Sequence, residues 1–115
     1  MGKIKMAELS KLALAVPSCK MAVISTAHVL ERDSELLPTL SWDKQEEEGL
    51  NWLVCTGTGW IVLPHEAEDW AEVLVHCGVS ESTIATITVL IDAGFDAVNF
   101  DVAASTIDGL PRYDW

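Results

Sequence analysis

Basic side chains are scarce in this sequence. Seven lysines and arginines stand against 18 aspartates and glutamates, which gives a net charge of −11. Because phosphate binding needs clustered lysine and arginine, this scarcity argues against direct binding to DNA or RNA. The imbalance favours a protein partner whose surface is basic. The charge is also uneven: residues 1–20 carry four lysines and one glutamate, whereas the rest of the chain carries three basic and 17 acidic side chains.

Cysteines are few, and no long apolar run is present. Cys19, Cys55 and Cys77 form no C-x-x-C pair, and three is an odd number for a disulfide framework. The three histidines lack the spacing of a structural zinc site, so we expect no metal and no cofactor. No apolar run approaches the roughly 20 residues that span a bilayer. We therefore expect a cytoplasmic protein that does not bind membranes.

Length and composition predict a single globular domain over residues 1–115, since 115 residues can bury one core but not two. Within it, residues 1–19 are expected to form a flexible or loosely packed basic N-terminal arm. Hydrophobic periodicity and turn residues then predict the following elements: strands at 20–25, 52–55, 60–63 and 97–100, and helices at 29–37, 67–75 and 80–94.

These elements predict an α+β (two-layer α/β) fold, with a small sheet of about four strands packed against two or three helices. The strand order stays open. Pro38 is expected to end or kink the first helix, and Ser80 and Ser82 are candidate N-caps of the last one. The residues after the final strand read as a loop-like tail. Its terminal Trp115 is expected to lie as a lid on the sheet, where burial would oppose fraying.

Two segments carry a resemblance. Ser25-Thr26-Ala27-His28 follows the first predicted strand, and Gly109-Leu110-Pro111, Tyr113, Asp114 and Trp115 close the chain. The pair resembles the signature of a family of small bacterial proteins of unknown function that are found on plasmids and integrating elements. The resemblance implies no enzyme activity, and it implies a genetic setting in which small acidic proteins often act on host defence systems. Leu30 departs from the family's small hydroxyl helix cap, so the start of the first helix is open.

Ser25, Thr26 and His28 are the candidate catalytic residues. A hydroxyl followed three residues later by histidine could supply a nucleophile and a base if the backbone turned them together. However, the sequence has no G-x-S-x-G elbow and no acid placed to orient His28. The alternative, which we favour, is that the hydroxyls cap the helix entrance and His28 makes a structural hydrogen bond.

Two acidic runs are the candidate partner-binding surface. They comprise Glu46, Glu47 and Glu48 beside Trp42, and Glu66, Glu68, Asp69 and Glu72. Carboxylates at such spacing could imitate nucleic-acid phosphates, although a solvated surface is the commoner explanation of any single run. The sequence thus favours a non-catalytic binding protein of a mobile element that docks on a basic, nucleic-acid-binding surface of a host or phage protein, as an anti-defence inhibitor would. Alternatives are a hydrolase-like enzyme centred on Ser25, Thr26 and His28, or an oligomerisation module, such as a homodimer, joined through the apolar segment 83–91.

Overall fold

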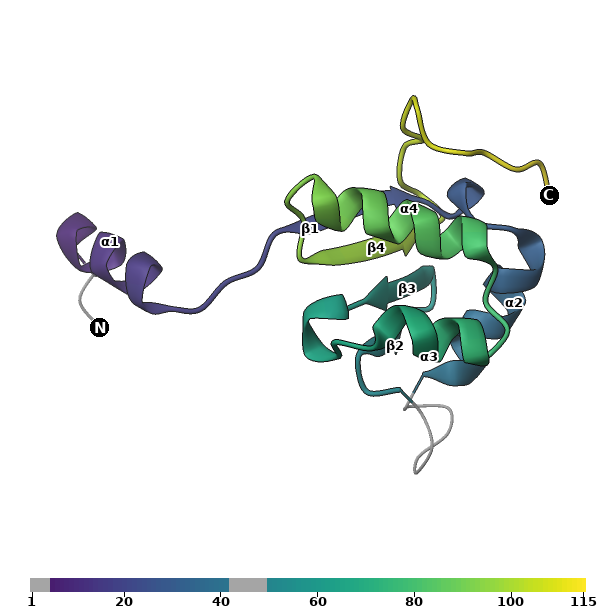
Figure 1. Cartoon of the computed structure of the whole chain (residues 1–115). Helices are drawn as coiled ribbons and strands as arrows, with labels where there is room; N and C mark the ends of the chain where they lie inside the picture. Colours follow the sequence, from purple (N-terminus) through teal and green to yellow (C-terminus); the bar gives the residue numbers. More distant parts are fainter. Residues whose placement is uncertain (1–4, 42–49) are drawn as a thin grey trace.

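The computed structural model describes residues 5–41 and 50–115. Its sheet has four strands in the order β1-β4-β3-β2. β1 (Met21–Ser25) and β4 (Ala97–Asp101) are parallel, while β3 (Gly59–Val62) runs antiparallel to both β4 and β2 (Leu53–Cys55). The predicted strands and the hairpin are confirmed, and so is the small α+β fold. The strand order, which had stayed open, places the first and last strands side by side (Figure 1).

Three helices share the core with the sheet. α2 (Glu31–Leu40), α3 (Trp70–His76) and α4 (Glu81–Asp92) each bury apolar side chains in one cluster with the strands. Two short 3₁₀ helices, η1 (Thr26–His28) and η2 (Pro64–Glu66), follow β1 and β3. α3 begins at Trp70 rather than at 67, because Pro64 starts η2 and the chain turns before the helix.

One face of the sheet is buried and the other is partly open. Side chains alternate across a strand, and Ala22, Ile24, Trp60, Val62 and Phe100 all point into the core. The row beside them on the outer face pairs Val23, Asn99, Ile61 and Val54 across the four strands. Val23 is 52% exposed, and Ile61 and Val54 are half-buried. The outer face is therefore mostly apolar, with the polar Asn99 on β4, and it is incompletely covered.

Pro38 does not end α2 where the sequence predicted. The helix starts at Glu31 and continues through Pro38 to Leu40. The first predicted helical residues, 29 and 30, instead follow η1, and Leu30 occupies the N-cap without a side-chain hydrogen bond. Proline removes one backbone donor and is costly in a helix interior. Here it lies in the last turn, where the buried Leu37 anchors the helix to the core.

The N-terminal arm is partly helical. α1 (Met6–Ala15) has no buried residue and lies apart from the sheet, joined to β1 by an extended segment (Figure 1). The radius of gyration is 16.4 Å, against about 13 Å for a compact domain of this length. The arm accounts for the elongated shape.

The C-terminal tail crosses the end of β1, but it does not rest on the sheet as expected. The Tyr113 N–H donates to the Ala27 carbonyl, and the Trp115 indole N–H donates to the Val29 carbonyl, both at 2.9 Å. Trp115 remains 52% exposed. A tryptophan ring has one polar donor, and here that donor, rather than full burial, ties down the chain end.

Candidate functional site

His28 is held by the tail. Its side chain is 1% exposed. Nδ1 lies 2.7 Å from the Pro111 carbonyl oxygen, and Nε2 accepts a hydrogen bond from the Ile107 N–H at 2.9 Å. Because a carbonyl can only accept, Nδ1 carries the proton and the neutral ring uses both nitrogens. Histidine in this arrangement joins two distant segments of backbone.

The neighbouring hydroxyls are also part of the structure at the end of β1. Ser25 Oγ accepts from the Ala27 N–H at 3.1 Å and caps η1. Thr26 is 9% exposed. A general base needs a nitrogen that is free to take a proton, and both nitrogens of His28 are engaged by backbone groups. The catalytic hypothesis for Ser25, Thr26 and His28 stays a prediction, and it would require the tail to move.

The predicted acidic surface is described in part. Glu66 ends η2, Glu68 and Asp69 lie in the turn before α3, and Glu72 lies in the first turn of α3; all four are exposed. The other members of the predicted surface, Trp42, Glu46, Glu47 and Glu48, lie outside the described residues.

A surface pocket opens beside Glu66, at the edge of the sheet where β1 and β4 begin and β3 ends. Its volume is about 480 Å³. Three chain segments line it: Pro17, Ser18 and Cys19 before β1, His65 and Glu66 after β3, and Asp96 before β4. A second cavity of about 160 Å³ shares His65 and Asp96 and adds the apolar side chains of Pro64, Trp70, Ile91 and Phe95. We call the two together the His65 groove.

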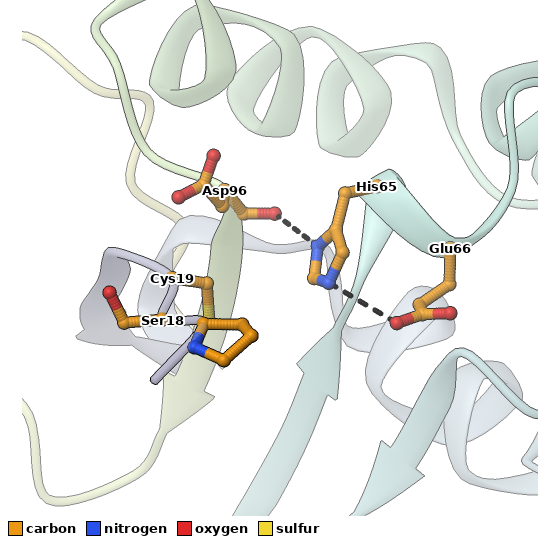
Figure 2. A pocket seen from close by; sticks show the side chains of 6 residues that line it. Ser18, Cys19, His65, Glu66 and Asp96 are labelled. Atoms are coloured by element: carbon orange, nitrogen blue, oxygen red, sulfur yellow. Dashed lines mark hydrogen bonds and ion pairs between the residues drawn. The ribbon is translucent and has the colours of Figure 1, made fainter. Parts of the chain in front are cut away.

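The imidazole of His65 lies between a backbone carbonyl and a carboxylate. Figure 2 shows the ring facing the Asp96 carbonyl oxygen and the Glu66 carboxylate, with Ser18 and Cys19 across the pocket. Nδ1 is 3.2 Å from the Asp96 oxygen, and Nε2 is 3.3 Å from Glu66 Oε1. With Nδ1 donating to the carbonyl, Nε2 can donate to Glu66 only when the ring is protonated. A positively charged group in this groove, such as the imidazole itself when it is protonated, therefore lies beside hydrogen-bond acceptors.

The Phe95 ring of the apolar lobe already contacts one cation of the chain itself. The Lys20 ammonium lies 4.6 Å from the centroid of the Phe95 ring. The Lys20 N–H donates to Asp96 Oδ2 at 2.8 Å, and the Asp96 N–H donates back to the Lys20 carbonyl at 2.7 Å. Cations are attracted to the faces of aromatic rings. Carboxylate and aromatic groups in one groove match the chemistry of a lysine or arginine side chain.

Sequence reasoning missed Ser18, Cys19, His65, Trp70 and Asp96 as neighbours. Each lies beside a strand end or helix start, but the meeting point follows from the antiparallel pairing of β3 with β4, which the sequence left open. Among the described residues, no group of three or more histidine, cysteine, aspartate or glutamate side chains could hold a metal ion. Nor does any helix in residues 5–41 and 50–115 have the length and apolar character to cross a bilayer.

Comparison with protein families identifies the family of the chain. Residues 21–115 match the C-terminal domain of a family of unknown function, DUF5983. The matched range begins at β1 and includes both the segment Ser25–His28 and the terminal tail, while the arm with α1 precedes it. No curated protein and no solved structure matched the chain. The expectation of a family of unknown function is confirmed at that level: the chain belongs to the DUF5983 C-terminal domain family.

Proposed function

We propose that the protein is a non-catalytic binding protein that docks on a basic surface of a protein partner through the His65 groove and the acidic residues beside it. The observation that carries the proposal is that few carboxylates are neutralised within the fold. In the described part of the chain Arg32–Asp33 is an ion pair, the His65–Glu66 contact becomes one only when the imidazole is protonated, and neither involves a lysine. The remaining carboxylates leave a negative field that attracts basic surfaces and speeds their encounter.

The groove adds specificity to this attraction. A lysine or arginine side chain of the partner has an apolar stem and a charged head. The stem fits the lobe formed by Trp70, Ile91 and Phe95, while the head is drawn to Glu66 and Asp96. Arginine is favoured over lysine, because its planar head can bind a carboxylate through two hydrogen bonds and stack on an aromatic ring. Glu68, Asp69 and Glu72 would then form the polar rim.

The plasmid setting implied by the family resemblance suggests which class of protein the partner belongs to. Proteins that bind nucleic acid carry basic surfaces, and an acidic protein from a mobile element that covers such a surface would block it. We propose a nucleic-acid-binding protein of the host or of a phage, as in an anti-defence inhibitor. The acidic body supports this choice over direct binding to nucleic acid, because phosphates would be repelled.

The experiment is a calorimetric titration of the protein with a short synthetic peptide that carries three arginines, at low and at physiological salt. We expect binding that weakens as salt is added, because surface charges are screened over about 8 Å at 0.15 M. Glu66→Gln should weaken binding about fivefold, on the scale of one exposed charge pair. Glu35→Gln, an equal charge change on α2, is the matched control and should bind like the wild type. Salt-insensitive binding, or equal losses in the two variants, would contradict the proposal.

A further inference from the structure

α1 has an apolar surface that nothing in the described part of the chain covers. Five large apolar side chains of the helix and its C-cap are between 42% and 89% exposed: Met6, Leu9, Leu12, Leu14 and Val16. Isolated helices shorter than about 12–15 residues are marginal in water even when their sequence favours helix. α1 has ten residues. A helix of this length and composition therefore needs a surface to pack against.

The outer face of the sheet has the chemistry to receive it. Met21 and Val23 on the edge strand β1 are 37% and 52% exposed. The row of Val23 continues through the polar Asn99 on β4 to the apolar Ile61 and Val54 on β3 and β2. The described helices of the body share the core on the opposite face. Charge adds to the match, since three lysines and one glutamate give the arm, residues 1–19, a charge of +2, and the rest of the chain carries −13.

The connecting segment opposes packing of α1 on the sheet of its own chain. Lys20 is fixed by its two backbone hydrogen bonds with Asp96 and by its contact with the Phe95 ring. Pro17 restricts the backbone of the segment, and both ends of α1 lie well away from the sheet in Figure 1. Because the arm is fixed at its root and directed outward, α1 is better placed to contact the sheet of a second molecule than the sheet of its own chain. The contacts between helix and sheet would be the same in either case.

We propose that α1 docks on the outer sheet face of a second copy of this chain, while α1 of the second copy docks on the outer sheet face of the first. The result is a symmetric homodimer in which the two chains exchange their arms. Such an exchange is isologous, so every contact between helix and sheet occurs twice. The surface differs from the one first considered from the sequence, because the apolar segment 83–91 lies within α4, whose Ile87 and Leu90 are buried in the core. The proposal does not depend on the His65 groove, which lies at an edge of the sheet.

The test is sedimentation velocity of the full chain over a concentration series. We expect a dimer for the wild type. Leu12→Glu should weaken association at least tenfold, and so should Val23→Glu on the receiving face. Ser10→Glu adds the same charge to the same helix without removing an apolar contact and should leave the dimer intact. Thermal unfolding of each variant, followed by circular dichroism, verifies that the body stays folded.

Mixing the two weakened variants separates this arrangement from other dimers. The Leu12→Glu chain keeps an intact face and the Val23→Glu chain keeps an intact helix, so the mixture regains one of the two contacts. We expect association in the mixture that exceeds that of either variant alone and stays weaker than that of the wild type. A monomeric wild type, a Leu12→Glu variant that remains dimeric, or a mixture without regained association would each overturn the proposal.

Discussion

Asp33 links two helices that are far apart in sequence. Its side chain is fully buried on α2. Oδ1 accepts from the Ser80 N–H and from its hydroxyl, each at 3.1 Å, and Oδ2 accepts from the Thr83 hydroxyl at 2.5 Å. Ser80 is the N-cap of α4, as predicted, but its hydroxyl makes no cap hydrogen bond to the helix backbone. The carboxylate of another helix instead binds the groups at the start of α4. Arg32 adds to this link between α2 and α4, because its Nε–H donates a 2.8 Å hydrogen bond to Ser80 Oγ.

Replacing Asp33 should therefore be costly. Asp33→Ala leaves the Ser80 N–H and the Thr83 hydroxyl buried without an acceptor, and we expect the free energy of unfolding to fall by about 3 kcal/mol. Asp33→Asn keeps one acceptor oxygen and should cost roughly half as much. Urea unfolding followed by tryptophan fluorescence measures both. An alanine variant that unfolds within about 0.5 kcal/mol of the wild type would show that these hydrogen bonds do not stabilise the fold.

At the scale of elements, the tail stabilises the end of β1 from outside the sheet. Besides the contacts of His28, Ala27 and Val29 with the tail, the Ser25 N–H donates to the Ser105 carbonyl at 3.2 Å. All of them join the tail either to Ser25, the last residue of β1, or to the segment that follows it, and none of them pairs two strands. The tail thus covers the first strand end although it has no regular secondary structure of its own.

Removal of residues 108–115 should consequently destabilise the protein. The truncated chain loses the hydrogen bond that the Pro111 carbonyl accepts from His28 and the bonds that the Tyr113 N–H and the Trp115 indole donate. Each is worth about 1 kcal/mol, so we expect a loss of about 3 kcal/mol in urea unfolding. Binding of the arginine peptide should not change, because the His65 groove lies where β1 begins and not where it ends. Trp115→Phe, which keeps an aromatic ring but replaces the indole by a smaller ring without an N–H donor, should lose about a third as much stability. A truncation that weakens peptide binding without loss of stability would contradict this assignment.

The elements that could be predicted from the sequence are those whose signal is local. The hairpin follows from Gly57 and Gly59 between two apolar runs, and Gly59 is required in addition because a Cβ there would overlap the carbonyl oxygen of Phe100. The continuation of α2 through Pro38 could not be predicted, because it depends on burial of Leu37. The role of Asp33 depends on a residue 47 positions away, and no periodicity signals such a pair.

The candidate site also divides into residues that a local sequence pattern signals and residues that only the fold brings together. Glu66 was predicted from its acidic run, because a run of carboxylates is visible in one segment. His65 and Asp96 were not predicted as partners, since they are 31 residues apart and meet only through the strand order. His28 was expected to make one structural hydrogen bond and makes two, both to a tail whose course no local pattern reveals.

At the scale of the whole molecule, charge divides the chain into a basic arm and an acidic body. The arm, residues 1–19, carries +2, and the rest of the chain carries −13. The arm also holds the exposed apolar helix, and the body holds both the open sheet face and the His65 groove. In our account the two surfaces have different occupants: the sheet face receives α1 of a second copy, and the groove receives a basic side chain of another protein. Association of two copies would place two grooves in one assembly and raise its avidity for a partner with repeated basic sites.

The most direct test of the central claim is a nuclear magnetic resonance titration of isotope-labelled protein with the arginine peptide at low salt. We predict that the largest amide shifts fall on Cys19, His65 and Asp96, with a shift of the Trp70 indole N–H, and that these shifts shrink as salt is added. Shifts spread evenly over all acidic segments, or concentrated on the tail around His28, would contradict the assignment of the His65 groove as the docking site.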